Sequence, residues 1–197
     1  MRRSLIPLLR CPLCRRGALI PEATESRRIE FGPLTCEACH HGFPVAEGVV
    51  DLGPRDVAPH HALARRAFES TAFARSWRRV VRPALLALGG GRGFGLEDEA
   101  ALVRGLLNEP QGPILDVGCG TGALLRALSR RTELPPLIGL DVSRAMLEEA
   151  LNYSREEGVP LSLVRAEAPA LPFHDGALGG VAGAAMVGVR MADRWPP

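Results

Sequence analysis

Two acidic residues in the second half of the chain each end a short apolar run. The first, Asp116, is followed by a turn in which glycine alternates with small residues up to Gly122. An apolar run, a glycine turn and a helical pattern in that order predict a buried strand, a tight bend and a helix start. A bend without Cβ atoms lets backbone approach a bound molecule closely. The helix start adds unpaired N–H groups that suit an anion.

The second acid, Asp141, ends the run Leu137–Asp141 and follows Asp116 by 25 residues. In a strand–helix–strand unit, an acid about 20 residues after the glycine turn hydrogen-bonds the ribose of a bound nucleotide. Ser143 lies at the next helix start, where its hydroxyl would cap the helix, and Gly158 would end that helix. The spacing therefore predicts a cradle for an adenosine-like group between two neighbouring strands.

The stretch Ile114–Gly122 resembles the first motif of class I S-adenosylmethionine (SAM)-dependent methyltransferases, which has two hydrophobic residues, an acid and three alternating glycines. Further motifs follow in that family's order, namely Gly139–Ser143, Arg165–Ala168, Leu171–Phe173 and Gly183–Ala185. The chain is thus similar to UbiE-like (methyltransferase type 11) enzymes that carry an N-terminal cysteine ribbon. Its layout is also similar to that of the 23S ribosomal RNA guanine-N1 methyltransferases.

The resemblance implies that SAM is the cofactor. Asp116 would lie near its methionine part, Asp141 would accept the ribose hydroxyls, and Glu167 would replace the aspartate that usually contacts the adenine amino group. The implied cofactor-binding set is Asp116, Gly118, Cys119, Gly120, Thr121, Gly122, Asp141, Val142, Ser143, Met146, Ala166, Glu167, Ala168 and Ala184. No catalytic residue is assigned, because methyl transfer would rest on proximity and orientation. An NAD-type site fits less well, since the last glycine of G-x-G-x-x-G is missing.

Four of the five cysteines form two C-x2-C pairs separated by 21 residues, and they are Cys11, Cys14, Cys36 and Cys39. Each pair can aim two thiolates at one point, and two pairs complete the tetrahedron that Zn²⁺ prefers. We expect a structural zinc ribbon over residues 8–52, with a β-hairpin between Leu19 and Leu34. The alternatives are disulfides, a metal-free hairpin held by packing, and replacement of one cysteine ligand by His40 or His41.

These elements predict an α/β chain. A partial Rossmann-like sheet of about four parallel strands (residues 111–187) follows the β-rich ribbon and a helical lead-in (residues 60–108). The lead-in has a helical run from His60 to Leu88, which Pro83 would break or kink, and a second helix from Glu97 to Leu107. Its first helix is either a cap over the cofactor site or, as the pattern favours, a packing helix with a solvated arginine face.

The tail, residues 188–197, does not resemble the continuation of the family, which has seven strands. We therefore expect a truncated or frame-shifted product, or a fragment, in which the fourth strand, Val181–Val187, is an exposed apolar edge prone to self-association. In that case weak cofactor binding would survive and catalysis would be lost. The alternative function is a non-catalytic zinc-ribbon module that binds RNA or protein.

Charge and hydropathy limit the classes of partner and the location that we expect for the protein. The formal net charge is +2, all 24 basic residues are arginine, and seven of them crowd the first thirty positions, namely Arg2, Arg3, Arg10, Arg15, Arg16, Arg27 and Arg28. This region makes RNA one candidate acceptor or partner, beside a small molecule, and the methyl acceptor stays unassigned. No apolar run approaches the ~20 residues of a membrane span. A cytoplasmic location is the default expectation.

Overall fold

The first part of the chain forms an antiparallel sheet. The computed structural model describes residues 1–22, 26–53, 68–91, 93–107, 109–130 and 134–183. A 3-10 helix, η1 (Arg3–Leu8), precedes four short strands, which are β1 (Leu19–Pro21), β2 (Gly32–Cys36), β3 (Gly42–Ala46) and β4 (Val49–Asp51). Neighbouring strands pair antiparallel in chain order. The pairing of β1 with β2 confirms the hairpin expected between the two cysteine pairs.

The second part forms a parallel sheet with the strands β5 (Ile114–Val117), β6 (Leu137–Asp141), β7 (Ser162–Arg165) and β8 (Gly180–Ala182). They lie side by side in the order β7-β6-β5-β8. All four residues of β5 are buried, as a parallel strand between two covered faces requires. The predicted partial Rossmann-like sheet of four parallel strands is confirmed. The fourth strand ends at Ala182, and residues 184–187 of the predicted strand lie outside the described residues.

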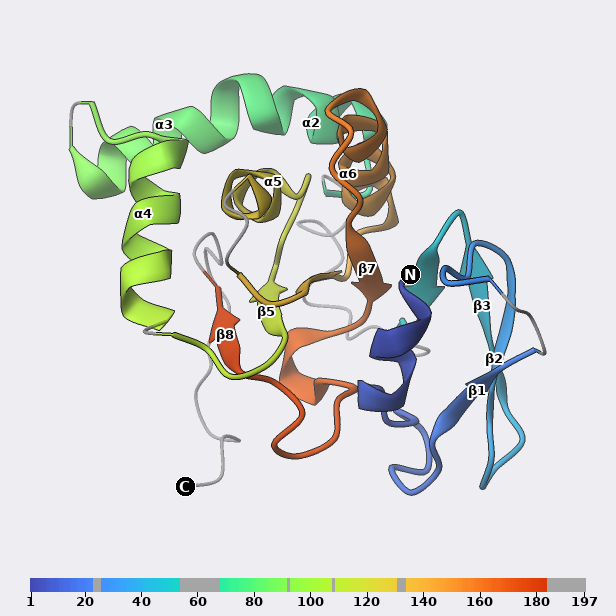
Figure 1. Cartoon of the computed structure of the whole chain (residues 1–197). Coiled ribbons are helices and arrows are strands. Elements are labelled where there is room, and N and C mark those ends of the chain that lie inside the picture. Colours follow the sequence, from blue (N-terminus) through green and yellow to red (C-terminus); the bar gives the residue numbers. More distant parts are fainter. Residues whose placement is uncertain (23–25, 54–67, 92, 108, 131–133, 184–197) are drawn as a thin grey trace.

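The two parts share one eight-stranded sheet, because β4 pairs in parallel with β7. Strand β4 therefore both ends the ribbon and extends the Rossmann-like sheet beyond β7. Figure 1 shows β1, β2 and β3 on one side of the molecule and β8 towards the other, with β7 and β5 between them. Leu34, Val50 and Val164 belong to one buried apolar cluster, so the ribbon and the parallel sheet have a common core.

The helical lead-in crosses the molecule beside the parallel sheet. Helix α2 (Thr71–Ser76), a π-helical turn η3 (Trp77–Val81) and α3 (Arg82–Gly90) follow one another without a break. In Figure 1, α2 and α3 run along the top of the view, and α4 (Leu96–Leu107) descends beside them. Pro83 does not end the run, because it is the second residue of α3 and directly follows the π-helical turn η3, where the regular hydrogen-bond ladder is already altered. Residues 54–67, which include the expected start at His60 and His61, lie outside the described residues.

Two further helices connect the parallel strands. Helix α5 (Ala123–Ser129) follows the glycine turn, and α6 (Arg144–Glu156) follows β6. As expected, Ser143 caps α6, since its Oγ accepts a hydrogen bond from the Met146 N–H at 3.1 Å. Gly158 adopts a φ of 66° just after that helix, a conformation that suits a helix end. Within the described residues no helix has the length and apolar character needed to cross a membrane.

Candidate functional site

The turn between β5 and α5 requires glycine at three positions. Gly118, Gly120 and Gly122 adopt φ values of 71°, 53° and 69°, which L-residues with side chains rarely tolerate. A Cβ on Gly122 would lie 2.9 Å from Leu161 Cδ1 and could not be accommodated without movement. The N–H groups of Gly118 and Cys119 both donate to the Leu140 carbonyl, at 2.8 and 3.0 Å. These bonds hold the turn against the end of β6.

Asp141 braces this turn from the neighbouring strand. Its Oδ2 accepts a hydrogen bond from the Gly120 N–H, and its Oδ1 accepts one from the Ser143 N–H, both at 2.8 Å. Burial raises the pKa of Asp141, and the N–H donors of Ser143 and Gly120 partly offset that effect. Each carboxylate oxygen has a second lone pair, so the same side chain can also accept a ligand hydroxyl.

Asp116 lies on the same face of the sheet as Asp141. It is opposite Gly139 on β6, and Asp141 comes two residues later, so the strand alternation places both carboxyl groups on one face. Only 4% of Asp116 is exposed. Burial raises its pKa to about 7, the nearby Arg82 lowers it, and Glu99 and Asp141 raise it further. The carboxyl group of Asp116 therefore titrates close to neutral pH.

The raised pKa of Asp116 predicts a pH-dependent stability. Its folded-state pKa of about 7 exceeds the unfolded value of 3.8, so the folded chain holds this proton more tightly. The free energy of unfolding should therefore fall by up to about 4 kcal/mol between about pH 4 and about pH 7, and then level off. Urea unfolding across this range should show a flatter profile for Asp116→Asn. Identical profiles for the variant and the wild type would contradict a raised pKa.

The turn also carries a buried hydroxyl with no partner in the described part of the chain. Thr121 Oγ1 is buried and makes no hydrogen bond there, while the residue as a whole is 1% exposed. An unsatisfied buried hydroxyl costs about 1–3 kcal/mol, which a polar ligand at the turn would recover. The cradle of glycine, Asp141 and Thr121 thus fits a small ligand with hydroxyl and charged groups.

The lead-in covers this cradle from above. The Ser143 Oγ donates to the Phe68 carbonyl at 2.7 Å, and the Arg144 N–H donates to Glu69 Oε2 at 3.2 Å. Trp77 packs on Met146 of α6, and its Nε1 lies 3.4 Å from the place a Cβ on Gly120 would occupy. Sequence analysis did not single out Trp77 for the site. Its contact with the glycine turn depends on how η3 crosses the sheet.

The first helical run of the lead-in shows features of both interpretations, a packing helix with a solvated arginine face and a cap over the site. Arg75, Arg78 and Arg79 are exposed, as the packing interpretation expects. Arg75 pairs with Glu149 at 3.2 Å, so part of this arginine face is bound to α6 rather than free for a substrate. The opposite side of the same helical run approaches the glycine turn through Trp77, as a cap would.

The other predicted residues fall around the same edge, with one exception. The Ala166 N–H donates to the Asp141 carbonyl at 3.1 Å, so the segment after β7 begins beside the cradle. Glu167 and Ala168 follow there and are partly exposed. Cys119 is buried, and burial raises the pKa of its thiol well above the usual value, which fits a packing side chain rather than a nucleophile. Ala184 lies outside the described residues.

The sequence did not predict a buried ion pair that lies near Asp116. Arg82 of α3 and Glu99 of α4 are both nearly buried, with Nη2 and Oε2 2.5 Å apart. Their charges act on Asp116, since Arg82 lowers its pKa and Glu99 raises it. Nothing in the spacing of these residues marks them, because they lie on separate helices 17 positions apart.

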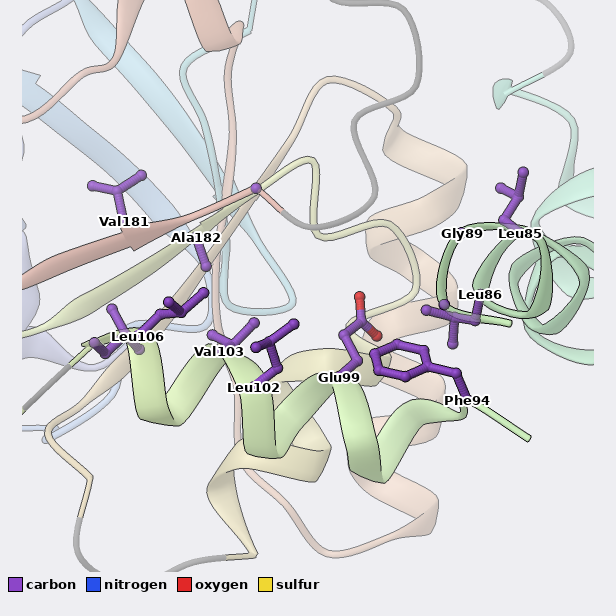
Figure 2. Close-up of a pocket in the computed structure, with 13 residues that line it drawn as sticks. Leu85, Leu86, Gly89, Phe94, Glu99, Leu102, Val103, Leu106, Val181 and Ala182 are labelled. Atoms are coloured by element: carbon purple, nitrogen blue, oxygen red, sulfur yellow. The ribbon is translucent and has the colours of Figure 1, made fainter. Parts of the chain in front are cut away.

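Glu99 also faces a hollow of about 690 Å³ between α3, α4 and the edge strand β8. Figure 2 shows Leu102, Val103 and Leu106 rising from α4 towards β8, with Glu99 beside Phe94. Val181 of β8 is 48% exposed, and within the described residues β8 pairs only with β5. This edge of the sheet is therefore apolar and partly open.

The four paired cysteines converge at the other end of the sheet. Their sulfur atoms all lie within 4.8 Å of one another, and the set is Cys11, Cys14, Cys36 and Cys39. Cys11 Sγ is 3.7 Å from Cys39 Sγ, and Cys14 Sγ is 3.6 Å from Cys36 Sγ. Four sulfurs at about 2.3 Å from one Zn²⁺ would stand roughly 3.8 Å apart, so the geometry is compatible with zinc. The distances are too long for disulfides, and all four thiols are free.

Local hydrogen bonding favours the thiolate form at one of these cysteines. Backbone N–H groups of Arg16 and Gly17 lower the pKa of Cys14 to about 6. A thiolate is the form that binds metal. Neither histidine joins the cluster among the described residues, and the His41 ring instead stacks edge-on against Phe43.

Known proteins match this chain in the region of the cradle. Residues 114–194 match the family described as a methyltransferase domain. An uncharacterised chloroplastic methyltransferase of Arabidopsis thaliana is 26% identical, and the match covers 89% of this chain and 53% of that protein. The uncharacterised methyltransferase YodH of Bacillus subtilis is 34% identical over 89 residues, which are 45% of this chain and 37% of that protein.

Among solved structures, a proposed SAM-dependent methyltransferase of Methanococcus maripaludis overlaps 55% of this chain and 47% of its own, with 20% identity and a TM-score of 0.43. The chain spans about half the length of the Arabidopsis relative. The second half of the chain, from β5 onward, is thus similar to a methyltransferase domain.

Proposed function

We propose, on the premise of this similarity, that the protein binds SAM at the carboxyl ends of β5 and β6 and passes its methyl group to an acceptor. The observation that supports this most is the double role of Asp141. One carboxylate fixes the glycine turn through the Gly120 N–H and the start of α6 through the Ser143 N–H. The Asp141 carboxylate thereby fixes the glycine turn, which would hold the methionine part of SAM, relative to the start of α6 beside the proposed ribose site.

The residues around the cradle would divide the ligand between them. Asp141 would accept the ribose hydroxyls with its remaining lone pairs, and the backbone of the turn, Gly118–Gly122, would face the methionine part. Asp116 would supply negative charge below the turn, and its pKa near 7 makes that charge sensitive to pH. The adenine would lie among the remaining predicted residues, Val142, Met146, Ala166, Glu167, Ala168 and Ala184. Bound SAM supplies an activated methyl group, which these residues orient without a covalent step.

The cysteine cluster would hold a structural Zn²⁺. Four thiolates and no free ligand position make a closed tetrahedral site, which suits a structural ion rather than a catalytic one. Such an ion would fix the turns that follow Cys11 and Cys36, and both turns support the strands that continue into the shared sheet.

Calorimetric titration of the zinc-loaded protein tests the proposal directly. SAM and its product S-adenosylhomocysteine (SAH) should each bind at one site per chain, and NAD should produce no binding heat. Binding should also change the fluorescence of Trp77, which touches the glycine turn. The variant Trp77→Phe identifies the part of the signal that belongs to this indole. Absence of SAM and SAH binding would refute the function.

A second candidate function, RNA binding, is favoured by one surface feature. A hollow of about 630 Å³ near the N-terminus is lined by four arginines and two serines, which are Arg2, Arg3, Ser4, Ser26, Arg27 and Arg28. Arginine forks and hydroxyl groups are the donors that phosphate groups prefer. We propose that RNA phosphates enter this hollow, with RNA either as methyl acceptor or as the partner of the ribbon.

Neutralising two of these arginines should weaken RNA binding. The Arg2 N–H donates to Ser162 Oγ and the Arg27 carbonyl accepts from the Arg3 N–H, so R2Q/R27Q leaves these backbone contacts in place. Log affinity falls as log salt concentration rises. For a short single-stranded RNA, loss of two phosphate contacts should make this slope shallower by about 1.4. Fluorescence anisotropy at several salt concentrations measures this slope. The control R15Q/R16Q removes the same charge outside the hollow, and an equal loss in both variants would reject the site.

A further inference from the structure

Arg165, the last residue of β7, joins three segments that are distant in sequence. Its Nε donates to the Val142 carbonyl at 3.0 Å, and its Nη1 donates to both carboxylate oxygens of Asp51, at 3.2 and 3.1 Å. Its Nη2 lies 3.7 Å from Glu69 Oε1. The side chain is 18% exposed, so these ion pairs are largely shielded from water.

Each contacted segment belongs to a different part of the molecule. Val142 lies between Asp141 and Ser143, at the centre of the proposed ribose site. Asp51 is the last residue of β4, the strand through which the ribbon joins the sheet. Glu69 also accepts the Arg144 N–H, so it ties the covering lead-in to the start of α6.

The end of the ribbon strand β4 packs closely against Arg165. The Leu52 N–H donates to the Arg165 carbonyl at 2.9 Å, and the Gly53 N–H donates to Asp51 Oδ1 at 2.9 Å. A Cβ on Gly53 would come within 2.8 Å of Arg165 Nη1. The end of β4 therefore closes around the guanidinium group, and Asp51 sets the plane in which the group lies.

We infer that Arg165 is a positioning residue through which the ribbon strand β4 sets the geometry of the adenosyl site at Asp141–Ser143. Asp51 orients the guanidinium plane, and the oriented Nε holds the Val142 carbonyl. The peptide after Asp141 is thereby kept in place, and with it the Ser143 N–H that the Asp141 carboxylate accepts. The inference rests on the proposed function, and it makes the ribbon a part of the cofactor site rather than an appended module.

The chemistry of arginine explains why a simple positive charge would not suffice. Its planar fork can donate to a carboxylate and to a carbonyl in fixed directions at the same time. A lysine ammonium at position 165 would keep the charge near Asp51 but could not hold both partners in these directions. The variant Arg165→Lys therefore separates positioning from charge.

A second ion pair, between the ribbon and helix α6, provides the control. Arg155 Nη2 lies 2.7 Å from Glu47 Oε2, with side chains 59% and 53% exposed. Arg155 lies near the end of α6, and Asp141 precedes its start, so a helix of about 1.5 Å rise per residue separates them. The variant Glu47→Gln breaks an arginine–carboxylate contact of the ribbon that is more exposed and lies far from the adenosyl site.

The experiment compares Arg165→Lys, Asp51→Asn and Glu47→Gln in the zinc-loaded protein. Calorimetry measures SAH affinity, and hydrogen exchange of the ligand-free protein measures protection of the Gly120 and Ser143 amides. We expect Arg165→Lys and Asp51→Asn each to weaken SAH binding about tenfold and to speed exchange at both amides. Glu47→Gln should change neither quantity. The double variant D51N/R165K should bind SAH no more weakly than the worse single variant, because both act on one element.

Three results would overturn the inference. They are SAH affinity within twofold of wild type in Arg165→Lys, additive losses in the double variant, and an equal loss in Glu47→Gln. If Arg165→Lys fails to fold, the SAH affinity of Asp51→Asn and its comparison with Glu47→Gln decide the inference. If the wild type binds no SAH, the proposed function fails by itself. The exchange rates at Gly120 and Ser143 then still decide whether Arg165 positions this segment.

Discussion

Replacing Asp141 with alanine is expected to lower the affinity for SAM by at least about 100-fold, equivalent to roughly 3 kcal/mol. The substitution removes the acceptor of two backbone N–H groups, those of Gly120 and Ser143, as well as the proposed acceptor of the ribose hydroxyls. The glycine turn and the start of α6 would then lose their common anchor. Calorimetric titration with SAM and SAH measures the effect, because binding does not require knowledge of the methyl acceptor.

Asp175→Asn is the control for this experiment. Asp175 is an acid whose side chain is 97% exposed, and it forms an ion pair with Arg10 at 3.7 Å. It should bind SAM as the wild type does. If Asp141→Ala bound SAM with an affinity within threefold of the wild type, the adenosyl group would have to lie elsewhere on the molecule.

Substituting Cys36 with serine is expected to abolish stoichiometric zinc binding and to lower the melting temperature by more than about 10 °C. Zinc binding contributes about 10–16 kcal/mol of apparent free energy in small zinc-binding folds, and removal of one thiolate forfeits much of it. Cys36 is completely buried and belongs to the core cluster that joins the ribbon to the parallel sheet. Loss of the metal should therefore destabilise both parts.

Metal analysis and thermal unfolding of purified protein check this result. The matched variant is Cys119→Ala, which removes a buried thiol outside the cluster and should leave one zinc per chain. The treatment of wild type with a chelator should reproduce the melting temperature of Cys36→Ser. A metal-free wild type with an undiminished melting temperature would instead support the hairpin that is held by packing alone.

The local parts of both sites could be predicted because their information lies in short stretches of chain. Glycines at alternate positions after an apolar run mark a turn with positive φ, and a serine before a helical pattern marks a cap. Two C-x2-C pairs can be recognised without knowing the distance between them in space. Four parallel strands could be expected from the resemblance to a known family, and the structure pairs them in the order β7-β6-β5-β8.

The long-range partners could not be predicted in this way. The pairing of β4 with β7 joins residues 114 positions apart at Asp51 and Arg165, and a strand of three residues carries too little pattern to choose its neighbour. The burial of Arg82 with Glu99, and the approach of Trp77 to Gly120, depend on how separate helices cross.

Spacing along the chain thus established the kinds of site present, a glycine cradle with an acidic partner and a four-cysteine cluster. The joining of these sites into one sheet became visible only in the folded molecule. The reason is physical: backbone turns, caps and metal knuckles are built from neighbouring residues, whereas strand partners and buried ion pairs are selected by packing of the whole core. The guanidinium of Arg165 acquires its role only when β4, β6 and the lead-in meet around it.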